Sequence, residues 1–236
     1  NVPVVKDDGG FVIELSDSAG ALLSQVTADM ATCADCLAEM ADEKDFRHGY
    51  PFINCTNCGP RYSIVRNIPY DRPNTTMSVF EMCEKCRAQY TNVADRRFHA
   101  QPVACAVCGP RIRLADNTGK TIETQTDSII AETASLLASG NILAIKGIGG
   151  FHLAVDALNE EAVARLRQRK RRDHKPFAMM ATSIEKIREY AIVSEPAKRL
   201  LKSPQSPIVL LPKKKDTSIA QSVAEGVKTY GFMLCY

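Results

Sequence analysis

The sequence predicts a cysteine-rich, metal-stabilised region with little regular structure, followed by an α/β domain. Two observations carry this prediction. Eight of the nine cysteines lie in C-x-x-C pairs in the first half of the chain. Beyond about residue 115, short apolar stretches alternate with helical patterns, as is typical of an α/β domain. The chain has 236 residues, enough for one or two domains.

The composition excludes several classes of protein. Hydrophobic residues make up 45% and charged residues 24%, which is ordinary globular usage and argues against disorder. The net charge of +3 is too small for a polycation that coats nucleic acid. No apolar run approaches the roughly 20 residues of a membrane helix, and the N-terminus has no apolar signal core. We therefore expect a soluble, cytoplasmic protein, and we expect the chain, which lacks an initiator Met, to be a piece of a longer one.

The cysteine spacing predicts two zinc sites. The spacing C-x2-C-x18-C-x2-C repeats after 24 residues, and two such pairs supply the four thiolates of a closed tetrahedral zinc site. Disulfides are disfavoured in reducing cytosol, and four identical pairs suit ligation better than redox chemistry or an iron–sulfur cluster. Cys235 lies outside the pairs and is expected to be a buried thiol. The predicted ligands are Cys33, Cys36, Cys55, Cys58, Cys83, Cys86, Cys105 and Cys108.

The cysteine region, expected over residues 25–115, is an internal repeat with a period of 50 residues. Asp45 and Arg47 in the first half correspond to Asp95 and Arg97 in the second. The string CGPR occurs in both halves at equivalent positions, residues 58–61 and 108–111. Each zinc ion could be held by consecutive pairs, or the outermost pairs could share one ion around an inner site. The spacing does not choose between these arrangements.

The residue pattern of the sequence changes after the cysteine region. Residues 1–24 are expected to be an extension or linker, 116–126 a polar linker, and 127–236 the α/β domain. Asn159, followed by two glutamates, predicts the start of a helix. The other patterns predict helices from 127 to about 139, over 183–190 and over 194–202, and strands over 142–145, 177–181, 207–211 and 231–236.

Two features of this second half could bind an anion. Lys146 precedes the glycine-rich run GIGG, whose backbone N–H groups could approach a phosphate, although a turn between two strands has the same composition. A basic run over residues 165–175 lies at the predicted end of a helix. Cations there favour the helix dipole, so a solvated helix end explains the run as well as a phosphate pocket or an RNA patch does.

Taken together, the motifs resemble the HypF family, the carbamoyltransferases of hydrogenase maturation. The resemblance rests on the cysteine spacing and on the strings FINCTNCGPR (52–61), RRFHAQP (96–102), AIKGIGGFHL (144–153) and LRQRK (166–170), followed by KP (175–176) and PIVLL (207–211). It covers roughly residues 25–236. It implies a zinc-finger region followed by a YrdC-like α/β domain. The chain is expected to contain only the N-terminal part of that domain.

The resemblance also implies an activity. Enzymes of this family use carbamoyl phosphate and ATP to make carbamoyl adenylate. They then carbamoylate the C-terminal cysteine of a partner maturation protein, and that group becomes the cyanide of [NiFe] hydrogenase. The K-x-R motif of the YrdC-like domain resembles Lys170 and Arg172, so these residues, with Lys146 and Lys175, are the candidates for binding phosphates or carbamate. The catalytic residues of transfer are not assigned. A zinc-containing RNA-binding or scaffold module without catalysis of its own is the alternative.

Overall fold

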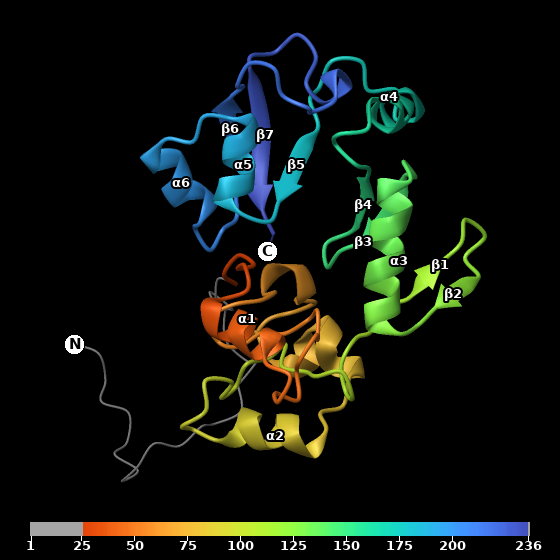
Figure 1. The fold of residues 1–236 in the computed structure, drawn as a ribbon. Coiled ribbons are helices and arrows are strands. Elements are labelled where there is room, and N and C mark those ends of the chain that lie inside the picture. Colours follow the sequence, from red (N-terminus) through yellow and green to blue (C-terminus); the bar gives the residue numbers. More distant parts are fainter. Residues whose placement is uncertain (1–25, 236) are drawn as a thin grey trace.

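The computed structural model describes residues 26–235, and the extension expected over residues 1–24 lies outside them. Figure 1 shows a lower part built from the cysteine region and an upper part built from the later helices and strands. We call residues 33–58 the first finger and residues 83–108 the second finger. The fingers pack on each other through direct hydrogen bonds, such as Asn54 Nδ2 to the carbonyl of Pro102 at 3.1 Å.

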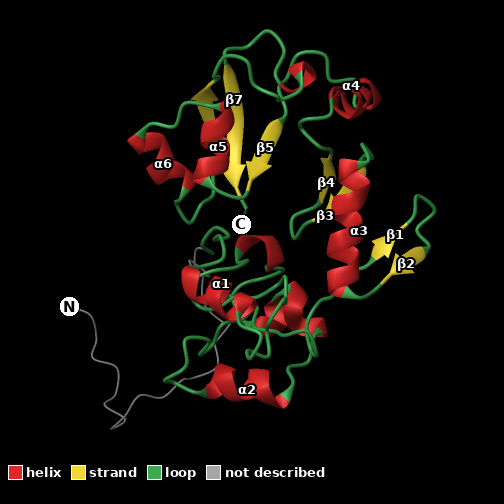
Figure 2. Cartoon of the chain, in the orientation of Figure 1, coloured by secondary structure: helices red, strands yellow, loops and turns green. Residues whose placement is uncertain are grey.

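Each finger contains one short helix that the sequence did not predict. These are α1 (Ala34–Ala41) and α2 (Glu84–Thr91), each of eight residues. Each begins directly after the first cysteine of a C-x-x-C pair, so Cys33 and Cys83 occupy the N-cap positions with extended backbone. The helices are too short for a periodic pattern. The rest of the fingers consists of turns, as Figure 2 shows, in agreement with the expected shortage of regular structure.

Beyond the fingers the chain forms two antiparallel pairs of strands and a long helix. The expected linker contains most of a hairpin, and the glycine-rich run is the turn between two strands, one of its two interpretations. Figure 1 shows α3 beside the second hairpin. The bounds of these elements are β1 (Leu114–Ala115), β2 (Thr121–Glu123), α3 (Thr126–Ala138), β3 (Leu143–Lys146) and β4 (Phe151–Ala154).

The last third of the chain forms a mixed three-stranded sheet in the order β5-β7-β6, with β5 parallel and β6 antiparallel to β7. The predicted helix start at Asn159 is confirmed, since its side chain accepts a hydrogen bond from the Ala162 N–H at 3.0 Å. The bounds are α4 (Glu160–Arg169), β5 (Ala178–Ala181), α5 (Ile184–Tyr190), α6 (Glu195–Leu201), β6 (Val209–Pro212) and β7 (Thr229–Leu234).

The described residues form two separate cores. The larger one joins the sheet to α5 and α6 around Ile187, Leu201 and Leu211. The smaller one lies mainly in the first finger and the segment after it, and its buried residues include Cys36, Cys55 and Cys58. Cys235 is exposed just beyond β7, so the expectation of a buried thiol is wrong. Among the described residues, no helix is both long and apolar enough to cross a membrane.

Candidate functional site

The eight paired cysteines form two sets of four. The first set is Cys33, Cys36, Cys55 and Cys58, and the second set is Cys83, Cys86, Cys105 and Cys108. Within each set the four sulfur atoms all lie within 4.8 Å of one another. Consecutive pairs therefore share a site, which decides between the two arrangements that the spacing left open.

The distances between sulfur atoms fit one tetrahedral metal ion per set. In the first set, Cys36 Sγ lies 3.6 Å from Cys58 Sγ, and Cys55 Sγ lies 3.8 Å from Cys58 Sγ. In the second set, Cys105 Sγ lies 3.8 Å from both Cys83 Sγ and Cys108 Sγ. Bonds of about 2.3 Å from zinc to four tetrahedral sulfurs require a sulfur–sulfur distance of about 3.8 Å. Four thiols close the coordination sphere, so such a site is structural.

The thiols of each set perturb one another's ionisation. Contact with Cys55 is the largest cause that raises the pKa of the Cys36 thiol, and burial raises the pKa of the Cys86 thiol. Hydrogen bonds from Cys36 and Cys58 lower the pKa of the Cys55 thiol. Four thiolates this close together need a nearby positive charge, which a divalent cation would supply.

The first CGPR string, at residues 58–61, has a local structural reason. Gly59 has a left-handed backbone with φ +91°, and a Cβ there would lie 2.5 Å from Cβ of Asn54. The next arginine, Arg61, folds back and donates from Nη2 to the carbonyls of Cys55 and Thr56, both at 2.9 Å. Glycine allows the close turn, and arginine fixes the backbone of the knuckle that carries the ligands.

Three arginines contact the sulfur atoms, and sequence reasoning assigned them no role. Arg96 Nη1 donates to Cys36 Sγ at 3.2 Å, and Arg47 Nη2 donates to Cys86 Sγ at 3.3 Å. Arg97 Nη2 approaches Cys36 Sγ at 3.7 Å. The recurrence of Asp-x-Arg at the repeat period was the available signal, because a buried guanidinium needs a buried acceptor.

Glu39, on α1, accepts hydrogen bonds from both Arg96 and Arg97. Burial acts to raise the pKa of its carboxyl, but the hydrogen bonds from Arg97 and Arg96 outweigh it and lower the pKa. The finger region thus uses its arginines internally: Arg47 and Arg97 of the fingers are buried, as are Arg61 and Arg72 of the segment between them. This internal pairing leaves less basic surface for the RNA-binding alternative.

Removing metal from the protein with a chelator is expected to unfold the fingers and spare the sheet. The finger core is small and includes five of the eight paired cysteines, whereas the sheet core contains none. Hydrogen exchange should show backbone N–H groups of residues 33–114 losing protection while those of β5 and β7 keep theirs. Equal loss of protection in both parts would contradict this.

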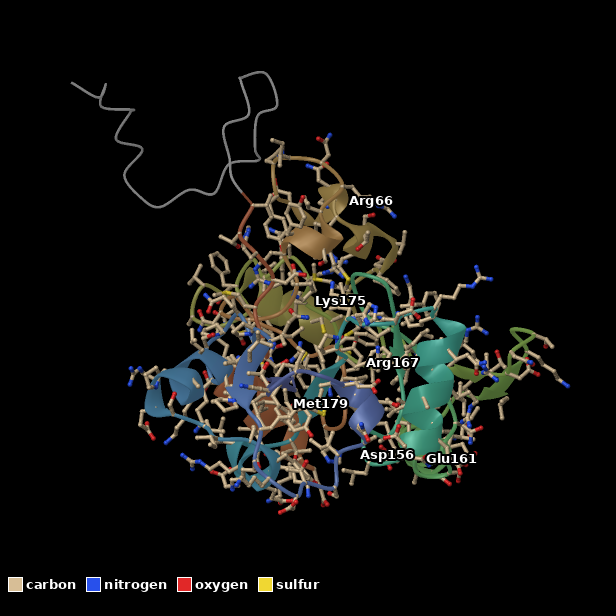
Figure 3. The ribbon with its side chains drawn as sticks, turned by 90° about the horizontal axis from the view of Figure 1, so that it is seen from above. Arg66, Asp156, Glu161, Arg167, Lys175 and Met179 are labelled. Atoms are coloured by element: carbon tan, nitrogen blue, oxygen red, sulfur yellow. The ribbon has the colours of Figure 1, made fainter. Side chains whose placement is uncertain are left out.

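The basic run forms a tight loop at the end of α4. Lys170 caps the helix, and Arg171 takes a left-handed backbone with φ +49°. Arg172 folds over the loop, donating from Nε to the carbonyl of Lys175 at 2.9 Å. Arg167 braces it from inside, with Nη1 2.6 Å from the carbonyl of Arg172; Figure 3 shows Arg167 and Lys175 close together.

The structure brings together Lys170, Arg172 and Lys175 and places Lys146 elsewhere. Lys146 ends β3 and is exposed, with Nζ 5.2 Å from the centre of the Phe151 ring. The β3–β4 turn borders a cavity of about 900 Å³ shared with the fingers, whose lining includes Phe52, Met77, Gly147–His152 and Met233. The three residues of the basic loop are absent from that lining among the described residues.

The comparisons with known proteins agree with this division. The HypF finger family matches residues 32–65 and 82–115. The Sua5–YciO–YrdC family, described as "Telomere recombination", matches residues 135–236. The fold and site therefore define a tandem four-cysteine finger joined to a Sua5/YrdC-like α/β unit.

Relatives and solved structures identify the family. The chain is 49% identical to carbamoyltransferase HypF2 of Cupriavidus necator over 98% of its length and 50% identical to carbamoyltransferase HypF of Rhodobacter capsulatus over 96%. A crystal structure of full-length HypF in the phosphate- and nucleotide-bound form matches 89% of the chain with a TM-score of 0.80 and 52% identity. The structure of T. kodakarensis HypF matches with a TM-score of 0.84 and 46% identity, again over 89% of this chain and 27% of that one. The chain belongs to the HypF family, and it spans 29% and 30% of these two relatives.

Proposed function

We propose that this chain is the finger and Sua5/YrdC-like portion of a carbamoyltransferase. The whole enzyme uses carbamoyl phosphate and ATP to form carbamoyl adenylate, and it carbamoylates the C-terminal cysteine of a partner hydrogenase-maturation protein. Identity of about one half with the HypF carbamoyltransferases, over nearly the whole chain, is the observation that carries the proposal. The cytoplasm is the proposed location.

The proposed role of the fingers is structural. Each four-cysteine set binds one zinc ion, two per chain, through the residues of the first and second sets. A segment of about 80 residues has a small core, so metal ligation supplies much of its folding free energy. Closed coordination leaves no position for substrate.

The basic loop is the proposed contact for the phosphates of ATP. Lys170 and Lys175 are exposed and supply mobile positive charge, while Arg172 is held in place by the loop carbonyls. Lys146 is the fourth candidate and, from its place on the β3–β4 hairpin, would contact a different part of the ligand. Positive charge held before the reaction begins stabilises charge that shifts during adenylation.

Calorimetric titration of ATP into the metal-loaded chain tests the nucleotide proposal. We expect saturable binding that the Lys170→Ala/Arg172→Ala variant weakens at least about tenfold, because each lost charge-assisted contact is worth about 1.5–3 kcal/mol. Lys215→Ala is the matched control, since it removes an exposed lysine from a loop after β6. Absence of binding to the folded chain, or equal loss in the control, would contradict a nucleotide pocket within these residues.

A further inference from the structure

Each finger places one buried arginine against the sulfur atoms of the other finger. Arg47 belongs to the first finger, but its Nη2 donates to Cys86 Sγ of the second set at 3.3 Å. Its Nε donates to the carbonyl of Ala104, also in the second finger, at 2.9 Å. The acceptors lie 39 and 57 residues away in the sequence. Arg47 therefore supports the ligands of the other finger and not those of its own.

Arg97 makes the mirror-image contacts. Its Nε donates to the carbonyl of Asn54 at 2.9 Å, and its Nη2 lies 3.7 Å from Cys36 Sγ. Asn54 and Cys36 occupy the positions that correspond to Ala104 and Cys86 in the repeat of 50 residues. The two fingers thus face each other as two copies in a twofold dimer do, with equivalent contacts in both directions.

Because Arg47 and Arg97 are charged, their contacts with the sulfur atoms depend on whether metal is bound at the two sets. Arg47 is 0% exposed and Arg97 1% exposed, and a buried guanidinium is costly unless a negative partner offsets it. Arg97 pairs with Glu39. Position 89, which corresponds to Glu39 in the repeat, holds Gln89, and within the described residues no carboxylate pairs with Arg47.

The negative partner of Arg47 is therefore the second set. Its Nη1 has no hydrogen-bond partner, and its Nη2 lies 3.3 Å from Cys86 Sγ. Four thiolates around one divalent ion carry a net charge of about −2, which an empty set of thiols lacks. Filling the second set thus stabilises the loop of the first finger that leads from Arg47 to Cys55.

We propose that Arg47 and Arg97 are positioning residues that couple the two sets, so that metal bound at one set raises the affinity of the other. The inference rests on the proposed binding of one ion at each set. Coupling of this kind is reciprocal, and in proteins it typically amounts to about 5- to 150-fold in affinity. Loss of the ion from one finger then weakens the binding of the ion in the other finger without abolishing it.

Metal titration with Co²⁺ and with Zn²⁺, in competition with a chelator, tests the coupling. Two variants keep one set each: Cys36→Ser/Cys55→Ser retains the second set, and Cys83→Ser/Cys105→Ser retains the first. In the unsubstituted protein, the product of the two stepwise association constants should exceed the product of the two single-set constants about tenfold or more. In the Arg47→Met/Arg97→Met background, the two products should agree within about twofold.

Control variants distinguish a failure of the coupling from a failure of the arginines' role or of the metal sites. Arg87→Met removes an exposed arginine of α2, next to Cys86, and should leave the coupling intact. Arg47→Lys/Arg97→Lys keeps the charge and should retain part of it, which a loss of folding would not. Two ions bound with equal products in the unsubstituted protein would overturn the coupling alone. Coupling that persists in the methionine background would overturn the role of the arginines, and absence of bound metal would overturn the proposed metal sites as well.

Discussion

Replacing Cys36 by serine is expected to remove about one metal ion per chain and to destabilise the fingers by more than about 3 kcal/mol. The Cys36 side chain is fully buried, and its sulfur lies 3.6 Å from that of Cys58 and 3.2 Å from Arg96 Nη1. A serine hydroxyl is a poor ligand for a soft thiolate site. It would also remove the sulfur atom to which the half-buried Arg96 donates. Elemental analysis of the metal content and thermal unfolding measure the two effects.

Cys235→Ser is the matched control for this prediction. It makes the same atomic change at an exposed cysteine outside both sets. It should alter neither metal content nor unfolding. Unchanged metal content in Cys36→Ser, or equal losses in both variants, would contradict the assignment of Cys36 as a ligand.

Arg72→Met is expected to destabilise the finger region by about 3–5 kcal/mol, the second largest effect. Arg72 Nη1 donates to the carbonyls of Gln101 and Val103 at 2.7 and 2.8 Å, and Nη2 donates to the carbonyl of Phe80 at 2.8 Å. Methionine fills similar space but leaves two buried carbonyl oxygens and one partly buried one without this partner, each costing about 1–3 kcal/mol. Unfolding of the fingers, followed by denaturant titration or heating, should show the loss.

Arg66→Met serves as the control, since Arg66 is exposed on the same segment between the fingers, as Figure 3 shows. Surface changes of this kind usually stay within about 0.5 kcal/mol. If the free energy of unfolding falls no more in Arg72→Met than in Arg66→Met, the three carbonyls do not depend on the Arg72 side chain. Metal content should stay at two ions in Arg66→Met.

The features that the sequence predicted correctly depend on short-range chemistry. The helix start at Asn159 needs only a side-chain oxygen and an N–H group three residues later. The turn between β3 and β4 needs only glycines between two apolar strands. The same holds for the close approach of the two sulfur atoms within each C-x-x-C pair, which the motif brings together by itself.

The features that the sequence missed or predicted wrongly are not determined by short-range chemistry alone. The helices α1 and α2 are too short to show a period, and Cys235 is exposed because of how the chain lies beyond β7. The run of charges also does not reveal that two guanidinium nitrogens of Arg172 donate to the carbonyls of Lys175 and Pro176, which fixes this side chain in the basic loop. The phosphate contact at Arg172 stays a prediction.

The sequence by itself determined which cysteines lie in close pairs and which family's motifs the chain carries, because spacing and residue type encode both. Only the tertiary structure decided that consecutive pairs share a set. It also decided that Arg47 and Arg97 each contact a sulfur atom of the other finger. The reason is distance along the chain. Cys86 lies 39 residues from Arg47, and Cys36 lies 61 residues from Arg97. Such contacts form when the two fingers pack, and no local pattern specifies how they do so.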